Sequence, residues 1–368
     1  MTDFSQLTTL RVGGPAARLV EPATRDELVA TTLRTWSEPE DWLLLGGGSN
    51  LVVADEGFDG TVVRVVTRGI EVLTPQPDSP RSVRLRVEAG EPWDAVVAHT
   101  AAQGWSGIEA LSGIPGSSGA APVQNIGAYG QELASSLVAI DFLDFDTDSL
   151  IRVPAAELGL GYRTSALKHG RLGLVVGLEL ALANDTGLSQ PIAYAQLATT
   201  LGVRIGDRVP VAELRAAVLE TRASKGMLWD EADPDSASAG SFFTNPVVSE
   251  QFARGLPADA PRWPTAPEEA HRVLPLGADI PPITRAARGE YLVKLSAAWL
   301  IEKSGISRGF AIPGSRAAVS SKHTLAIVNR GGATARDVVQ LAGYIQTRVM
   351  SEFGVNLQPE PVLVGVQL

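Results

Sequence analysis

Near its N-terminus the chain reads Leu43-Leu44-Leu45-Gly46-Gly47-Gly48-Ser49-Asn50-Leu51. The leucines predict a buried strand, and the glycines predict a turn whose backbone can approach a phosphate closely. A Rossmann fingerprint does not fit, because its third glycine would fall at Leu51, and no Gly-Lys-Ser or Gly-Lys-Thr of a Walker loop follows. Taken alone, this segment fits a tight structural turn as well as a phosphate-binding loop.

A second glycine-rich segment favours the binding interpretation. It reads Ser112-Gly113-Ile114-Pro115-Gly116-Ser117-Ser118-Gly119-Ala120-Ala121-Pro122-Val123-Gln124-Asn125-Ile126-Gly127-Ala128-Tyr129-Gly130. A turn needs one or two glycines. This segment has five, and it has almost no large side chain, so it predicts extended backbone lying along a large ligand. The side-chain amides of Gln124 and Asn125 could bind the edge of a heterocycle.

Helix and strand signals alternate along the rest of the chain, which indicates an α/β or α+β fold. Capping residues and apolar positions at helical spacing predict helices after Thr24, from Pro92 to Gln103 and after Thr334. Asp230–Ala239 is expected to be a loop or linker, and the proline-rich Leu256–Pro282 a surface insertion. Strands are expected at Leu43–Leu45, Val62–Val66, Val83–Glu88, Ala139–Phe145, Leu174–Leu182, Leu325–Val328 and Val362–Val366.

Composition excludes several classes of function. The 368 residues carry a net charge of −10 without a basic tract, which disfavours binding to nucleic acid or an anionic membrane. The chain has no cysteine, so disulfides, thiolate catalysis and iron–sulfur clusters are excluded. The four histidines show no metal-ligand spacing, and no metal is expected. The N-terminus lacks signal-peptide character, so we expect a cytoplasmic protein without a membrane span.

The two glycine-rich loops, Gly46–Leu51 and Ile114–Gly130, closely resemble the flavin-binding half of the UDP-N-acetylenolpyruvoylglucosamine reductase family. The resemblance continues, in the family's order, through Gly161–Ser165, Gly240–Pro246, Val293–Glu302 and Leu357–Glu360. It implies an α+β protein with a two-subdomain FAD-binding fold of the vanillyl-alcohol oxidase type and a C-terminal α+β substrate-binding domain. The expected division is residues 1–67, completed by 360–368, then residues 68–229, and then residues 230–359.

The resemblance also implies a reaction. Members of the family use NADPH and non-covalent FAD to reduce an enolpyruvyl ether to UDP-N-acetylmuramate, in peptidoglycan precursor synthesis. We therefore expect a role in cell-wall biogenesis, cell shape and cell division, and a monomeric protein. The residues expected to contact FAD are Gly46, Gly47, Gly48, Ser49, Asn50, Leu51, Ile114, Pro115, Gly116, Ser117, Ser118, Gly119, Gln124, Asn125, Ile126, Gly127, Ala128 and Tyr129.

Three residues in matched motifs are the expected catalytic groups. Addition of hydride at C3 of the enolpyruvyl group leaves an enolate beside a carboxylate, and this charge needs cationic or hydrogen-bonding groups. The resemblance implies that Arg163 grips the carboxylate, that Ser241 protonates C2, and that Glu360 polarises or protonates the intermediate. A neighbouring positive charge or water would help Ser241 to regain its proton. A surface arginine, a capping serine and an exposed carboxylate are the ordinary structural roles for these residue types.

The substrate contacts implied by the resemblance are Tyr194, Lys225, Asn245 and Lys294. Trp263 is the candidate for stacking on uracil, although a long proline-rich stretch separates it from the Lys294 motif. The chain also departs from the family pattern at Val362, where an arginine is usual. Each of these side chains has an alternative role as an ordinary surface residue.

Two other functions are compatible with the sequence. One is a different oxidoreductase of the same flavin fold, acting on a sugar or an alcohol. Such enzymes often attach the flavin through histidine or cysteine, and neither occurs in Gly46–Leu51 or Ile114–Gly130. The other is a sugar-nucleotide-binding protein that has lost its flavin. Retention of both loops together with Arg163, Ser241 and Glu360 favours the reductase over this second alternative.

Overall fold

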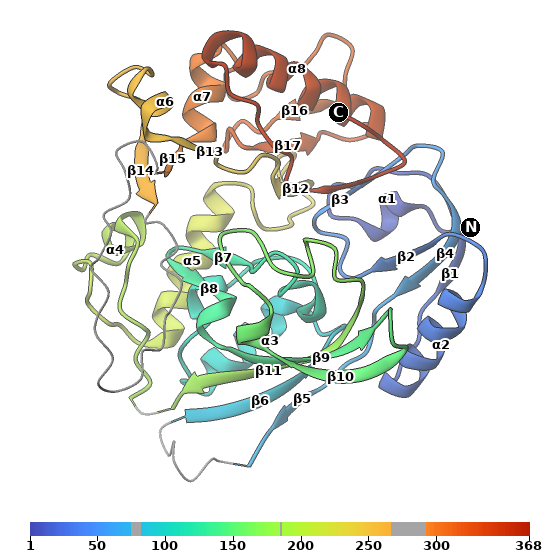
Figure 1. Cartoon of the computed structure of the whole chain (residues 1–368). Coiled ribbons are helices and arrows are strands. Elements are labelled where there is room, and N and C mark those ends of the chain that lie inside the picture. Colours follow the sequence, from blue (N-terminus) through green and yellow to red (C-terminus); the bar gives the residue numbers. More distant parts are fainter. Residues whose placement is uncertain (75–81, 185, 266–291) are drawn as a thin grey trace, which may run out of the picture.

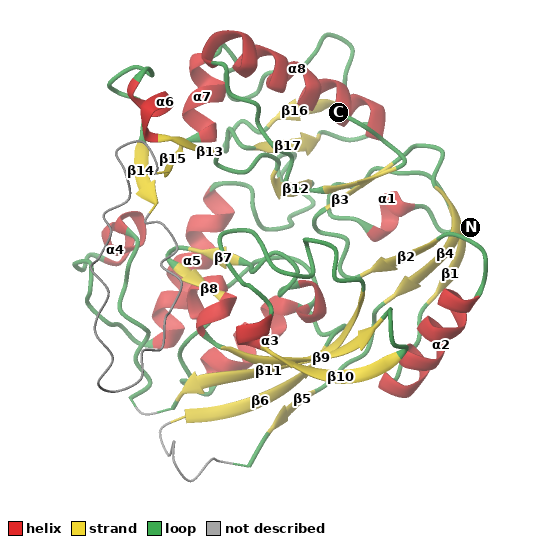
Figure 2. Cartoon of the chain, in the orientation of Figure 1, coloured by secondary structure: helices red, strands yellow, loops and turns green. Residues whose placement is uncertain are grey.

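The structure is a computed structural model that describes residues 1–74, 82–184, 186–265 and 292–368. It has mixed helix and strand content, with a three-stranded and a five-stranded sheet in the N-terminal half and a C-terminal part that carries the long helix α8 (Ala335–Phe353). Figure 1 shows the C-terminal part above the two sheets, and Figure 2 shows that long loops fill the space between them. Within the described residues, no helix is both long and apolar enough to cross a bilayer.

The first sheet is parallel and has the strand order β1-β4-β2. Its helix α2 (Arg25–Ser37) begins with the predicted capping box, in which Thr24 accepts from the Glu27 N–H and the Glu27 carboxylate accepts from the Thr24 N–H. The glycine loop after β2 leads into a short strand, β3, which pairs in parallel with β18 from the C-terminal end. These elements are α1 (Phe4–Leu7), β1 (Ala16–Val20), β2 (Trp42–Leu45), β3 (Leu51–Val53), β4 (Phe58–Arg64) and β18 (Val362–Val364).

The second sheet is antiparallel, with the order β10-β9-β11-β6-β5. Alternate residues of its strands face two different cores. Phe142 and Val175 pack with α3 (Trp93–Ala102) on one face, whereas Leu143 and Val176 pack with α2 on the other. This places the sheet between two helices. The strands are β5 (Ile70–Val72), β6 (Ser82–Glu88), β9 (Leu137–Asp144), β10 (Ser149–Pro154) and β11 (Gly173–Ala183).

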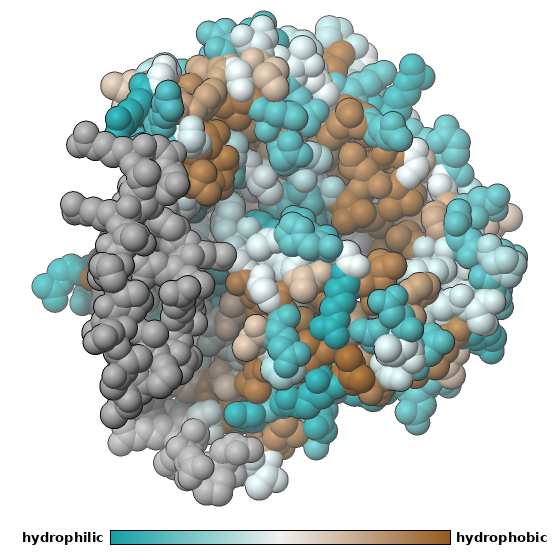
Figure 3. All heavy atoms as spheres, in the orientation of Figure 1, coloured by the Kyte–Doolittle hydropathy of each residue, from teal (hydrophilic) through white to brown (hydrophobic). Residues whose placement is uncertain are grey.

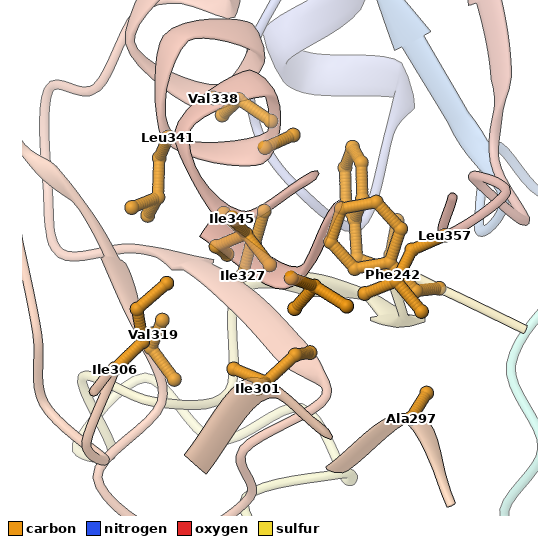
Figure 4. Close-up of a cluster of buried hydrophobic side chains, with 14 of the residues drawn as sticks. Phe242, Ala297, Ile301, Ile306, Val319, Ile327, Val338, Leu341, Ile345 and Leu357 are labelled. Atoms are coloured by element: carbon orange, nitrogen blue, oxygen red, sulfur yellow. The ribbon is translucent and has the colours of Figure 1, made fainter. Parts of the chain in front are cut away.

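The C-terminal part has its own core, beneath α8. In Figure 4, side chains of α8 point toward those of the sheet and of α7 (Ala297–Lys303), and Phe242 and Leu357 lie beside them. The helix starts at the predicted capping box of Thr334 and Asp337 and ends at Gly354, which has φ +66°. The sheets have the orders β12-β17-β16 and β13-β15-β14. Their elements are β12 (Ser238–Ser241), β13 (Val247–Ser249), α6 (Glu250–Arg254), β14 (Arg262–Thr265), β15 (Leu292–Leu295), β16 (Ala317–Val319) and β17 (Ala326–Asn329).

The expected strands and helices are present, with ends that differ by a few residues. One expectation is wrong: residues 112–130 are not extended, but fold into turns that include the short helix Ser118–Ala120 and the strand β7 (Gly127–Ala128). Gly113 and Gly116 have positive φ, which reverses the chain there. The insertion Leu256–Pro282 lies partly outside the described residues. Its described part, residues 256–265, is a loop that leads into β14.

Two of the helices that the sequence did not predict pack together. The helix α4 (Ala195–Leu201) and the helix α5 (Val211–Ser224) pack against each other and against the second glycine-rich segment, through a small core that includes Leu197, Leu214 and Val218. The apolar positions of α5 are mixed with charged ones, so its periodicity is weak. Its packing partners are distant in sequence, which is why local patterning did not predict it.

Candidate active site

Both glycine-rich loops line one cavity of about 520 Å³, together with residues from distant parts of the chain. This volume lies in the range of small-molecule and cofactor sites, which is about 300–1,000 Å³. The face of the molecule in Figure 3 is hollowed between the C-terminal part and the loops of the sheets. Of the residues predicted for FAD and catalysis, the cavity is lined by Gly46, Gly47, Gly48, Ser49, Asn50, Leu51, Ile114, Pro115, Gly116, Ser117, Gln124, Ile126, Gly127, Ala128, Tyr129, Arg163, Ser241 and Glu360.

The two loops touch each other at their glycines. A methyl group on Gly47 would lie 2.6 Å from the Cα of Gly116, and one on Gly46 would lie 2.4 Å from the Oγ of Ser117. The Ser49 hydroxyl donates to the Pro115 carbonyl at 3.1 Å and ties the loops together. Larger residues would separate the loops and reshape the cavity between them. The glycines are therefore needed for close packing of loop on loop.

Three of the predicted FAD contacts lie outside the cavity lining. The Asn125 side chain is fully buried: its amide N–H groups donate to Glu132 and to the Gly161 carbonyl, and its oxygen accepts from the Ala134 N–H. Ser118 is buried and donates to the Glu91 carbonyl, and Gly119 packs against Ala89. The hypothesis that the Asn125 amide binds a heterocycle is therefore wrong for this structure, because the protein already uses that amide to hold the loop. Gln124 does line the cavity.

Arg163 and Glu360 form an ion pair at the cavity. The Arg163 Nε lies 3.3 Å from Glu360 Oε1, and both side chains are largely buried, with 23% and 14% exposure. The Arg163 Nη2 also donates to the Gly127 carbonyl in the second glycine-rich segment, at 2.7 Å. Arg163 has φ +54°, an uncommon conformation for a residue with a side chain. The guanidinium is thus fixed in position by partners from two other segments.

Both glycine-rich loops also bind Glu360. The Gln124 amide donates to its carboxylate at 3.1 Å, and the Asn50 amide donates to its backbone carbonyl at 3.1 Å. Burial raises the pKa of the Glu360 carboxyl above its ordinary value, while the charges of Arg163 and Lys168 and the Gln124 hydrogen bond oppose this effect. A raised pKa makes a carboxyl group better able to hold a proton near neutral pH.

Val362, the residue that departs from the family pattern, lies beside these groups. It lines the cavity, its side chain is mostly exposed, and its N–H donates to the Asn50 carbonyl at 3.0 Å. This backbone hydrogen bond holds the start of β18 against the first glycine loop without any contribution from the side chain.

Ser241 ends β12 and lies beside a residue that the sequence did not indicate. Its Oγ is 3.4 Å from Nε2 of His323, and both residues line the cavity. Burial, together with the positive charges of Lys225, Arg308 and Arg222, lowers the pKa of His323 to about 4. The imidazole is therefore neutral near pH 7. The pairing of β12 with β17 places Ser241 opposite Ala326, three residues beyond the histidine, so only the strand pairing could have revealed this contact.

The predicted substrate residues fall into two groups. Tyr194 and Lys225 line the cavity, and the ring of Tyr194 packs edge-on against that of Tyr129, with 5.6 Å between centroids. The Lys225 ammonium lies over the Tyr129 ring and donates to Gln196 at 2.9 Å. Buried Arg222 also lines the cavity and was not predicted from the sequence. This side of the cavity is cationic and aromatic, which suits a phosphate-bearing ligand.

Asn245 and Lys294 do not line the cavity, but gather around Tyr162, the neighbour of Arg163 in the chain. The Lys294 ammonium lies 4.6 Å from the Tyr162 ring centroid and 6.0 Å from that of Trp263. The Asn245 amide hydrogen-bonds Tyr162 and accepts from the Ala297 N–H at 3.0 Å. Burial raises the pKa of Tyr162, so its hydroxyl stays protonated. Tyr162, Asn245, Lys294 and Trp263 form an aromatic and cationic patch next to Arg163.

Within the described residues, no group of three or more histidine or acidic side chains is arranged to hold a metal ion. The groups that the structure brings to the cavity are an arginine, a carboxyl group of raised pKa, and a serine hydroxyl beside a neutral imidazole. They lie on one cavity with two glycine-rich loops. This arrangement can bind a large anionic ligand, stabilise developing negative charge and supply a proton.

Comparisons with known proteins bear on the fold and on the family of the chain. Residues 16–153 match the model of an FAD binding domain, and residues 233–364 match that of the UDP-N-acetylenolpyruvoylglucosamine reductase C-terminal domain. Together they confirm the expected FAD-binding fold followed by the family's C-terminal domain. A solved UDP-N-acetylenolpyruvylglucosamine reductase from Thermus caldophilus superposes with a TM-score of 0.60 at 27% identity, covering 99% of this chain and 97% of that one.

Curated relatives extend over the whole chain. The UDP-N-acetylenolpyruvoylglucosamine reductase of Leifsonia xyli is 60% identical over 100% of both chains. That of Salinispora arenicola is 46% identical over 99% of this chain and 95% of its own. Relatives of this identity and coverage show the family to which the chain belongs. The chain belongs to the UDP-N-acetylenolpyruvoylglucosamine reductase family.

Proposed function

We propose that this protein reduces the enolpyruvyl ether of UDP-N-acetylglucosamine to UDP-N-acetylmuramate, with FAD as cofactor and NADPH as reductant, in peptidoglycan precursor synthesis. The observation that carries the proposal is the convergence of Arg163, Ser241 and Glu360 on the cavity formed by both glycine-rich loops. These residues come from three distant segments, and their chemistry matches what reduction of an enolpyruvyl group requires.

The walls of the cavity are suited to FAD. The loops approach each other so closely at Gly46, Gly47 and Gly116 that their backbone, rather than side chains, forms much of one wall. Backbone N–H groups in such loops suit a pyrophosphate. Gly46–Leu51 and the lining part of Ile114–Tyr129 are the residues that would hold the cofactor. When bound, FAD supplies the hydride chemistry, accepting a hydride from NADPH and giving it to the substrate.

The protein's own side chains stabilise the negative charge of the enolate and supply the proton that is added to C2. Arg163, already fixed by the Gly127 carbonyl, presents its guanidinium to the substrate carboxylate and to the enolate that forms beside it. Ser241 gives a proton to C2, and the carboxyl group of Glu360, with its raised pKa, stands next to Arg163 to stabilise the enolate. Tyr194 and Lys225 bind the diphosphate, and the Tyr162 patch with Asn245, Lys294 and Trp263 binds the uridine end.

The same proposal includes NADPH as the co-substrate, a cytoplasmic location, a monomeric state and a contribution to cell shape and division through the cell wall. We propose three domains along the chain. Residues 1–67 with 360–368 form the first FAD-binding subdomain, residues 68–229 form the second, and residues 230–359 form the substrate-binding domain. The direct test is an assay of NADPH oxidation with the enolpyruvyl sugar nucleotide, and a rate no higher than that without this substrate would overturn the proposal.

We expect the purified protein to be yellow, with one FAD that acid precipitation releases into the supernatant. The two loops contain neither histidine nor cysteine for covalent attachment. The structure brings His323 into the cavity, so the experiment also asks whether this residue attaches the flavin. Flavin that stays in the pellet would contradict the expectation and favour an oxidase-type relative. Colourless protein that cannot be loaded with FAD would favour the flavin-less binding protein.

Replacing Gly47 by alanine should weaken FAD binding by about 10- to 100-fold, the effect of forcing a methyl group into tightly packed backbone. The new Cβ would lie 2.6 Å from the Cα of Gly116, so one loop must move away from the other. Fluorescence titration of flavin-free protein with FAD measures the change.

The matched control for this substitution is Gly343→Ala, in α8. A methyl group there would meet nothing within 4 Å, and alanine favours helix, so FAD binding should be unchanged. Equal affinity in wild type and Gly47→Ala would show that the loops tolerate separation and that the cofactor does not depend on their contact.

A further inference from the structure

His323 lines the cavity, but it has no role in the reaction as proposed above. It lies in the turn between β16 and β17, and its Nε2 faces the Ser241 Oγ at 3.4 Å. Sequence patterning offered no role for it, because no other histidine or acidic residue stands at a metal-ligand spacing from it. The structure places it against the serine that is proposed to supply the proton.

The turn that carries His323 is held from several sides. The Ser320 hydroxyl accepts from the backbone N–H of both Lys322 and His323, at 3.1 and 3.2 Å. Buried Asp235 accepts from the N–H and from the hydroxyl of Ser321. The imidazole is therefore carried by a fixed backbone. A group that must meet a hydroxyl in one orientation needs such support.

Further contacts fix the two ends of the same turn. The Lys322 ammonium donates to Asp233 at 2.7 Å, and the Thr324 hydroxyl donates to Glu302. The segment that contains Asp233 and Asp235 leads directly into β12, which ends at Ser241. The turn and the serine are thus attached to the same part of the structure.

The charge state of the ring decides what it can do for Ser241. With its pKa near 4, the ring is neutral at pH 7 and has one N–H group. If Nε2 accepted a hydrogen bond from the Ser241 hydroxyl, the hydroxyl proton would point toward the imidazole and away from the substrate. The serine oxygen would then face the substrate with its lone pairs and could act only as a base. If Nε2–H donates to Oγ, the hydroxyl proton is free to point into the cavity, and the serine can act as an acid.

Building on the proposed function, we propose that His323 is a positioning residue which donates its Nε2–H to the Ser241 Oγ and thereby holds the serine as the acid for C2. In that step the Oγ–H bond breaks and a C2–H bond forms from the enolate electron pair. The oxygen left behind is an alkoxide, and the Nε2–H bond to it becomes shorter and stronger as its negative charge develops. The alkoxide then regains a proton from water, so the net reaction takes one proton from solvent.

The cations around the ring support the same direction of proton flow. Lys225 and Arg222 line the cavity on this side. Their charges lower the pKa of His323, which keeps the imidazole neutral, and they stabilise a transient negative charge on Oγ. Because the His323 imidazole is neutral, it adds no charge that would disturb the interaction between Arg163 and the substrate carboxylate. The serine thus becomes a stronger acid, while the group that donates directly to its Oγ stays neutral.

Three substitutions at one position test the proposal. Glutamine extends an amide N–H to about where Nε2 lies, whereas asparagine has the same amide on a shorter side chain, and alanine has no donor. We expect His323→Ala and His323→Asn to slow single-turnover reoxidation of the reduced flavin by the enolpyruvyl substrate by about 10- to 100-fold, the effect of losing a hydrogen bond to a charged group. His323→Gln should stay within about 5-fold of wild type, since it keeps the donor.

The reduction of the flavin by NADPH is the internal reference and should keep its wild-type rate in all three variants. Glutamine as slow as alanine, or alanine as fast as wild type, would overturn the donor role. Slowing of both half-reactions together would show that His323 only shapes the site. If His323→Ala does not retain flavin, the reoxidation rates of His323→Gln and His323→Asn test the donor role, and equal rates in these two variants would overturn it. Failure of the proposed function looks different, because wild-type reduced flavin would then not be reoxidised by the substrate at all.

Discussion

Replacing Ser241 by alanine is expected to slow substrate-driven reoxidation of the flavin by about 10²–10⁴-fold, the effect of losing a positioned proton donor. The hydroxyl lies at the end of β12, on the cavity wall and beside His323, and its proposed task begins only after the hydride has been transferred. Reduction of the flavin by NADPH should therefore proceed at close to the normal rate. Stopped-flow measurement of the two half-reactions separates these effects.

Other outcomes of this experiment would reassign the residue. If Ser241→Ala slows both half-reactions equally, the serine shapes the flavin site or the fold and does not act as the acid. If it slows neither, the proton comes from another group. Glu360 is then the next candidate, because its carboxyl has a raised pKa and pairs with Arg163 on the same cavity.

Replacing Arg163 by alanine should lower kcat/KM for the enolpyruvyl substrate by about 10²–10³-fold, the effect of truncating one partner of a buried charge pair. Two interactions are lost together. The substrate carboxylate no longer meets a guanidinium, and Glu360, now without its ion-pair partner at 3.3 Å, becomes still harder to ionise. KM should rise as well as kcat fall, because the arginine binds the ground-state carboxylate too.

Arg171→Ala is the matched control for this variant. Arg171 also pairs with a carboxylate, at 3.4 Å from Asp144, and its side chain is similarly buried, but it does not line the cavity. It should leave kcat/KM unchanged. An equal loss in the two variants would mean that the effect comes from weakened folding. A slower reduction of the flavin by NADPH in Arg163→Ala would also contradict the assigned role, since Arg163 is proposed to act on the substrate.

Much of the fold could be predicted because its signals are local. The capping boxes at Thr24 and Thr334 each need only four consecutive residues, and the structure has both helices where they were expected. The strand before Gly46 is a run of leucines followed by a turn that only small residues allow. The weakly periodic α5 was missed, because its stability comes from a distant core.

The sequence by itself determined the two glycine-rich loops, the family to which the chain belongs, and the three candidate catalytic residues in their matched motifs. Only the tertiary structure decided which groups meet. Gln124 hydrogen-bonds Glu360, which is 236 positions away in the sequence, and Ser241 lies beside His323, which is 82 positions away. Asn125 is next to Gln124 in the chain, but its side-chain amide hydrogen-bonds within the protein and holds the loop. The physical reason lies in the pairing of β3 with β18 and of β12 with β17. Residue identity fixes what a side chain can donate or accept, but long-range strand pairing fixes the partner that it finds.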